Sequence, residues 1–400
     1  MNDHYPNDHA RINGYVYSKF ALSILAHQND QPKITLEMSS QLFEPITIGR
    51  CQLRHRVVMA PMTRFRTDSD HAPLPIAKEY YSQRCHTPGT LLISEGTAVS
   101  ETLVGLPKWA GCWSEPQLNA WKQITQEVHS KGCFIFLQLC CAGRTADKGY
   151  PKLSSGDVPL DAHASAIEVE DDETPPKPMT EEDIQQAIRD HAKAASKAIA
   201  AGFDGVELHA ANGYLIDQFI QESCNNRTDR WGGSVENRSR FALEVAAAVV
   251  KVVGGDRVGF RISPWSTYHS ITPMNPEAQF SHLVTELQKF DLAYLHVITS
   301  KVDNWYDVDR EEPLDFVFDS WTKDTPVIIT GGFDAESARA AIEEEYRDFK
   351  LAVGFGRSFA STPDLVECFK KGIGPNAFDG ALAYTPETPR GYIDYPFLTS

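Results

Sequence analysis

Short, nearly continuous apolar runs recur along the chain between residues 56 and 357. We identify eight of them, at residues 56–62, 91–99, 133–139, 205–211, 258–264, 293–299, 326–332 and 351–357. Each is rich in Val, Ile, Leu or Phe, and most lack the strict alternation of a strand that has one solvated face. Such runs are typical of parallel strands that are buried on both sides.

A segment with helical character follows each run. The clearest spans residues 180–202, where Thr180 and Asp183 form a capping-box pattern and Gly202 ends the helix. Its apolar stripe consists of Ile184, Ile188, His191, Ala195 and Ala198. Further helices are predicted at residues 115–132, 235–254, 276–290, 334–346 and 362–372. Eight strands that are each followed by a helix predict an α/β fold, the (β/α)8 TIM barrel. A doubly wound sheet is the alternative, but no GxGxxG motif follows the first run.

Three segments lie outside this repeat. Residues 42–48 and 51–53, separated by Gly49-Arg50, predict a hairpin that plugs the bottom of the barrel. The long insertion after the third strand, residues 145–179, is rich in Pro, Asp and Glu, and we expect it to form a lid over the substrate. Residues 1–37 are polar with one short apolar run, which predicts a disordered extension before a single barrel domain at 38–400.

Composition narrows the class of partner. A hydrophobic content of 42% and a charged content of 23% are those of a globular protein with a large core. The net charge of −16 is spread along the chain, which argues against nucleic acid and anionic membranes as partners. The eight cysteines form no CxxC pair, so we expect no metal site and reduced thiols in the cytoplasm. No stretch is long enough for a membrane span. We expect a monomer or a homodimer.

The fourth run carries the most informative polar residues, in the sequence GVELHAANGYLIDQF at residues 205–219. The strand ends in the turn pair Asn212-Gly213, and a helical run begins at Tyr214. His209, Asn212 and Tyr214 therefore lie together at the carboxyl end of one strand. Two neutral hydrogen-bonding groups and a phenol suit the polarisation and protonation of a carbonyl compound. A motif this short, taken alone, also fits a core histidine and the aromatic end of a helix.

A second motif, NRTDRWGGSVENR at residues 226–238, changes that balance. Together with HAANGYL at 209–215, it resembles the old yellow enzyme family of FMN-dependent ene-reductases (NADH:flavin oxidoreductases). The resemblance runs from about residue 42 to residue 396 and includes the closing segment GYIDYP. It implies FMN as bound cofactor and NADPH as hydride donor. It also implies that His209 and Asn212 bind the substrate oxygen and that Tyr214 donates the proton.

Candidate cofactor contacts stand at the ends of the other runs. The amide of Gln138 can pair with both a donor and an acceptor on a pyrimidine-like edge, and Arg261 would stabilise an anionic reduced flavin. The glycines allow close backbone approach, and their nests beside Arg357 suit a phosphate. Each residue alone also fits an ordinary turn, ion pair or surface amide, but their common location on several strands favours a phosphate-bearing cofactor. The predicted FMN contacts are Pro61, Met62, Thr63, Gly96, Gln138, Arg261, Gly331, Gly332, Gly356 and Arg357.

Two departures from the family pattern lie on the substrate side. Cys140-Cys141 stand where the family usually has Trp and often His, and we expect Cys140 to line a widened substrate pocket together with Tyr384. Residues 299–301 replace a Glu-Pro-Arg-like segment. The predicted activity is NADPH-dependent reduction of the activated C=C bond of an enone or enal. The alternatives are a flavin-dependent isomerase or dehydrogenase of a biosynthetic intermediate on the same scaffold, and a non-catalytic binding barrel.

Overall fold

The computed structural model describes residues 40–161, 174–303 and 306–399, so the expected extension at residues 1–37 lies outside the described residues. Eight parallel strands form a closed barrel, one at each predicted position. Each strand pairs with the next, β16 pairs with β3, and β7 pairs with β10. The strands are β3 (Val57–Met59), β4 (Leu91–Ile93), β7 (Phe134–Cys140), β10 (Gly205–Ala210), β11 (Val258–Ile262), β12 (Tyr294–Ile298), β15 (Val327–Thr330) and β16 (Leu351–Phe355).

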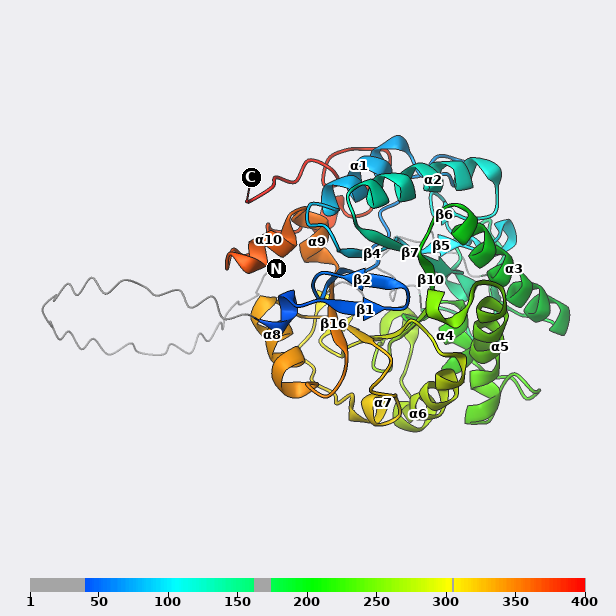
Figure 1. The fold of residues 1–400 in the computed structure, drawn as a ribbon. Helices are drawn as coiled ribbons and strands as arrows, with labels where there is room; N and C mark the ends of the chain where they lie inside the picture. The colour runs from blue at the N-terminus through cyan, green and yellow to red at the C-terminus, as the bar shows by residue number, and fades with distance from the viewer. Residues whose placement is uncertain (1–39, 162–173, 304–305, 400) are drawn as a thin grey trace, which may run out of the picture. The chain divides into compact units, whose positions relative to one another are not determined.

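Helices surround the strands, as Figure 1 shows. The main apolar core lies between the two layers, and it contains Val206 and Leu208 of β10. Because side chains alternate along a strand, Glu207 and His209 point to the barrel interior. No helix in the described ranges is both long and apolar enough to cross a membrane. The helices are α1 (Pro75–Arg84), α2 (Glu115–Ser130), α3 (Glu181–Ala200), α4 (Leu215–Ile220), α5 (Val235–Val253), α6 (Pro276–Leu287), α7 (Asp315–Asp319), α8 (Ala335–Ala340), α9 (Arg357–Ser361) and α10 (Leu365–Lys370).

The ends of the helices show how local chemistry sets their length. The capping box of α3 is confirmed, since Asp183 N–H donates to Thr180 Oγ1 at 3.2 Å and Thr180 N–H donates to Asp183 Oδ2 at 2.9 Å. The helix expected at 362–372 begins only at Leu365. Thr362 is extended, with φ −130° and ψ 94°, because a residue before proline is disfavoured in the helical region.

Two other predicted helices are continuous only in part. The segment 276–290 is α6 followed by a 3-10 turn at Gln288–Phe290. The segment 334–346 is the short helix α8 followed by a π-helical turn at Ala341–Glu345. Apolar periodicity extends across both junctions, so the pattern of residues alone did not reveal the change in winding.

The second run, expected as one strand over 91–99, is interrupted. β4 ends at Ile93, which pairs with Phe136, and the short strand β5 (Thr97–Ala98) resumes with Thr97 beside Leu139. Four residue steps on this strand therefore face three on β7, which is the signature of a β-bulge. Ser94 Oγ accepts the Gln138 N–H at 3.0 Å and so replaces part of the ladder inside the bulge.

The predicted hairpin is present as β1 (Ile46–Ile48) and β2 (Cys51–Leu53), which pair antiparallel. Gly49 has φ +54°, and a Cβ there would lie 2.1 Å from the carbonyl oxygen of Asp256, so the turn admits no larger residue. The apolar side chains of both strands pack against residues at the starts of the barrel strands, among them Val58, Leu91, Phe136, Ile328 and Ala352. The hairpin thus closes the amino end of the barrel, as expected.

The insertion between β7 and α3 contains a short parallel pair, β8 (Leu153–Ser154) and β9 (Lys177–Pro178). Residues 162–173 within it lie outside the described residues. Another short strand, β6 (Ala110–Gly111), pairs parallel with β5. After β12, β13 (Val302–Asp303) pairs antiparallel with β14 (Tyr306–Asp307). These additions all lie after the carboxyl ends of barrel strands, where TIM barrels build their active sites.

Candidate functional site

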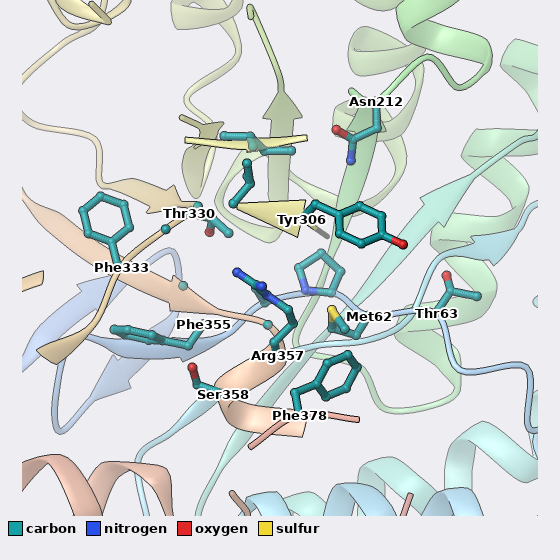
Figure 2. Close-up of a pocket in the computed structure, with 18 of the residues that line it drawn as sticks. Met62, Thr63, Asn212, Tyr306, Thr330, Phe333, Phe355, Arg357, Ser358 and Phe378 are labelled. Carbon is teal, nitrogen blue, oxygen red and sulfur yellow. The ribbon is translucent and has the colours of Figure 1, made fainter. Parts of the chain in front are cut away.

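A cavity of about 760 Å³ opens at the carboxyl ends of the barrel strands. Figure 2 shows part of its wall, with Arg357 near the centre of the view, Phe355 to its left and Met62 to its right. Most of the residues predicted from the sequence meet here. Those that line the cavity are Pro61, Met62, Thr63, Gln138, His209, Asn212, Tyr214, Arg261, Gly331, Gly332, Gly356, Arg357 and Tyr384. None of the described residues of the 145–179 insertion lines it, so the lid stays a prediction.

Gly96 and Cys140 are the two predicted residues that do not line the cavity. An added Cβ at Gly96 would come within 3.3 Å of the Trp109 indole and 3.4 Å of Thr63 Oγ1, so this glycine allows close packing just behind the wall. Cys140 is fully buried in an apolar cluster with Trp109 and Tyr214. The expectation that Cys140 itself widens the substrate pocket therefore lacks support from its position.

The end of β10 places three predicted residues with little freedom. Asn212 adopts φ +58°, and its backbone N–H donates to Ser263 Oγ at 2.8 Å. Gly213 N–H donates to the buried carboxyl of Asp217 at 2.9 Å, which fixes the turn into α4. As a result the rings of His209 and Tyr214 lie 5.2 Å apart, centroid to centroid. The histidine, the amide and the phenol therefore converge on one side of the cavity.

Burial sets the protonation state of two of these groups. Burial, with the nearby positive charge of Arg261, holds the pKa of His209 well below its usual range, so the imidazole is neutral. Burial also raises the pKa of Tyr214 well above its usual range, and the phenol keeps its proton. The site thus offers a neutral donor and a protonated phenol at neutral pH. His209 Nδ1 is buried and has no hydrogen-bond partner among the described residues.

Two further aromatic residues hold Tyr214, and neither was identified from the sequence. The Trp109 ring lies 5.7 Å from the Tyr214 ring, and the His269 ring meets it edge-on at 5.0 Å and 80°. His269 has φ +56°, and its Nδ1 lies 2.8 Å from the carbonyl oxygen of Asn212, so that nitrogen donates. The sequence could have indicated His269, because it follows the strand that carries Arg261. Trp109 lies in a loop without a distinctive motif.

Arg261 brings a fixed cation to the floor of the cavity. It is 7% exposed, and its Nε has no hydrogen-bond partner in the described part of the chain. Burial lowers its pKa and the carboxylate of Glu207 opposes that change, so the guanidinium stays charged. A buried cation with an unpaired N–H, facing a cavity, suits an anionic or strongly polar ring system.

The opposite end of the cavity suits a phosphate. Gly331 and Gly332 have φ +120° and +69°, values that side chains disfavour, and consecutive glycines leave their backbone N–H groups open to a ligand. Arg357, at the start of α9, forms an ion pair with Asp307 of β14. The glycine nest and the guanidinium would hold a phosphate, while the orphaned His209 and Arg261 nitrogens lie toward the strand ends. The residues present therefore fit FMN.

The fold and this site belong to one class of enzyme, the flavin oxidoreductases built on a (β/α)8 barrel. The model of the NADH:flavin oxidoreductase / NADH oxidase family matches residues 41–376, and the chain belongs to this family of FMN oxidoreductases. The X-ray structure of an old yellow enzyme homologue from Zymomonas mobilis is similar, with a TM-score of 0.83 and 34% identity. The match covers 90% of this chain and 100% of the Zymomonas mobilis chain.

Two relatives resemble the chain over nearly their whole length. One is the chanoclavine-I aldehyde reductase fgaOx3 of Penicillium roqueforti, 47% identical over 359 residues, with 90% of this chain and 96% of that protein covered. The other is the NADP-dependent oxidoreductase lnbE of Aspergillus flavus, 45% identical over 375 residues, with 90% and 97% covered. The family resemblance read from the two sequence motifs is therefore confirmed.

Proposed function

We propose that the protein reduces the activated C=C bond of an α,β-unsaturated carbonyl compound, with NADPH as the electron donor. The observation that carries this proposal is the convergence of His209, Asn212 and Tyr214 on a cavity whose floor holds Arg261. The names of the two relatives, an aldehyde reductase and an NADP-dependent oxidoreductase, support an enal substrate and NADPH.

Two groups of residues would hold the cofactor. Gln138 and Arg261 would contact the flavin ring, with Pro61, Met62 and Thr63 at its edge. Gly331, Gly332, Gly356 and Arg357, which forms an ion pair with Asp307, would bind the phosphate. Bound FMN supplies hydride transfer, accepting it from the nicotinamide and passing it to the substrate.

The chain's own residues activate the substrate. His209 and Asn212 donate hydrogen bonds to the carbonyl oxygen and draw electron density from the alkene, which makes its β-carbon electrophilic. A neutral imidazole does this without giving its proton away. Tyr214 then delivers its phenolic proton to the α-carbon. The aromatic contacts from Trp109 and His269 hold that phenol in place.

We also propose that the protein works in the cytoplasm as a monomer or a homodimer. All eight cysteines are free and buried, which agrees with a reducing compartment.

The purified full-length protein tests this proposal directly. We expect a yellow solution with stoichiometric FMN, bleaching under anaerobic NADPH, and recovery of the colour on addition of an enal such as cinnamaldehyde. NADH at the same concentration serves as the control for donor choice. A colourless protein that takes up no FMN would leave only the binding-protein alternative, whereas isomerised rather than reduced enal would favour the isomerase alternative.

A further inference from the structure

A buried polar cluster lies beneath the cavity and surrounds the carboxylate of Glu207. This residue is 0% exposed and none of the proposed steps uses it. Its Oε1 accepts a hydrogen bond from Gln138 Nε2 at 2.8 Å. Its Oε2 accepts two more, from the Tyr294 hydroxyl at 3.0 Å and from His296 Nδ1 at 2.7 Å. Two barrel strands, β7 and β12, thus direct donors at one carboxylate.

The carboxylate is ionised despite its burial. Burial alone would raise the pKa of Glu207, but its hydrogen bond with His296, the Arg261 guanidinium and the Gln138 amide together bring the pKa below its usual range. An ionised carboxylate accepts hydrogen bonds and cannot donate them. Every group that touches it must therefore present a hydrogen.

This requirement determines which way the Gln138 amide faces. Its nitrogen must point at Glu207, so its oxygen points elsewhere, and that oxygen accepts no hydrogen bond from the residues that the structure describes. Gln138 lines the cavity. It therefore presents to the cavity an acceptor oxygen and its second N–H, in a fixed order. An amide without such an anchor can rotate by 180° and exchange the two.

The requirement for donors at Glu207 also affects a second residue that lines the cavity. Burial lowers the pKa of His296, so its imidazole is neutral. Because Nδ1 donates to Glu207, Nε2 carries a lone pair, and the Thr330 hydroxyl donates to it at 2.6 Å. Thr330 also lines the cavity, so its remaining lone pairs are acceptors. The charge of Glu207 thus determines which atoms of Gln138 and Thr330 accept hydrogen bonds at the cavity surface.

We propose that Glu207 is a positioning residue that orients Gln138 for the imide edge of the flavin, whose ring N–H needs an acceptor and whose neighbouring carbonyl needs a donor. This inference rests on the proposed function, since it concerns the same cofactor. Glu207 also places a negative charge near Arg261. It therefore offsets part of the positive field that favours the reduced flavin.

The test is a double-mutant cycle on FMN binding. FMN is removed reversibly, and its dissociation constant is measured by fluorescence quenching for wild type, Glu207→Gln, Gln138→Ala and the double variant. We expect Glu207→Gln to weaken FMN binding about 10-fold, because an amide both donates and accepts and so no longer fixes the Gln138 oxygen toward the flavin N–H. In the Gln138→Ala background the same change should have an effect of less than about twofold. Equal losses in both backgrounds would overturn the proposal.

The reduction potential of the flavin is a second readout. A merely structural role of Glu207 would not make this potential more positive. Glu207→Gln removes a negative charge, so the flavin potential should become more positive even though binding weakens. Tyr294→Phe is the matched control, since it removes one hydrogen bond to Glu207 and keeps the charge, and it should leave the potential unchanged. A potential that stays at the wild-type value in Glu207→Gln would contradict the charge argument.

These outcomes are separable from failure of the proposed function. If wild type does not bind FMN, the function itself is wrong. If wild type binds FMN and Glu207→Gln binds it equally well, only the role of Glu207 is wrong. Should Glu207→Gln not fold, Glu207→Asp draws the carboxylate back by one methylene and keeps its charge. That variant should show a loss of FMN binding that again requires Gln138, and a loss independent of Gln138 would overturn the proposal.

Discussion

Replacing Tyr214 by Phe is expected to slow alkene reduction by about 10²- to 10⁴-fold, the contribution of a positioned general acid. The substitution removes only the hydroxyl, so the ring keeps its contacts with Trp109 and His269. Reduction of FMN by NADPH requires no proton on carbon and should proceed at nearly the wild-type rate. Stopped-flow measurement of the two half-reactions distinguishes the effects. Nitroalkenes should lose least, because water can protonate their stabilised anion later.

Two results would contradict this assignment. If both half-reactions slow together, the change has disturbed the flavin site rather than proton delivery. If neither slows, the proton comes from another group. Tyr384→Phe is a suitable control, because Tyr384 also lines the cavity but lies on the C-terminal segment rather than beside His209. Removal of the Tyr384 hydroxyl should leave proton transfer to the substrate intact.

Loss of Arg261 is expected to have the largest effect on the cofactor. A hydrogen bond from a charged group contributes about 1.5–3 kcal/mol, so Arg261→Ala should weaken FMN binding about 10- to 150-fold. The flavin potential should become more negative, because the reduced anion loses its neighbouring cation while Glu207 keeps its charge. The measurements are FMN titration and a dye-equilibrated reduction of the holoenzyme.

Arg261→Lys separates the two contributions. Lysine keeps the charge but lacks the planar fork, so its potential should stay closer to wild type while binding is still weakened. Wild-type affinity and potential in Arg261→Ala would place the guanidinium away from the flavin. The opposite signs expected for Arg261→Ala and Glu207→Gln provide an internal check, because a general loss of packing would not move the potential in both directions.

The sequence predicted the barrel because its strands are buried on both faces. Such strands appear as uninterrupted apolar runs in the sequence. Each barrel strand overlaps the run that predicted it. The bulge between Ile93 and Thr97 escaped detection, since Ser94 Oγ replaces a ladder bond through a contact with Gln138, more than forty residues away. The change of α8 into a π turn likewise depends on winding rather than on residue pattern.

Side chains at strand ends were predictable for a related reason. The barrel brings every carboxyl end to one face, so position along the chain was enough to bring His209, Gln138 and Arg261 together. The loops gave less information. Trp109 and His269 reach Tyr214 from loops whose paths depend on tertiary contacts. Cys140, expected to line the cavity, is not among the residues that line it and packs in a buried cluster with Trp109 and Tyr214.

The central claim is that hydride reaches the β-carbon of the alkene in this cavity rather than the carbonyl carbon. The most direct measurement mixes the anaerobically reduced holoenzyme with cinnamaldehyde and identifies the product of a single turnover. The proposed placement of His209 and Asn212 at the oxygen, with Tyr214 at the α-carbon, predicts the saturated aldehyde in an amount equal to the reduced FMN. Cinnamyl alcohol as the product, or no product while the flavin stays reduced, would contradict the account.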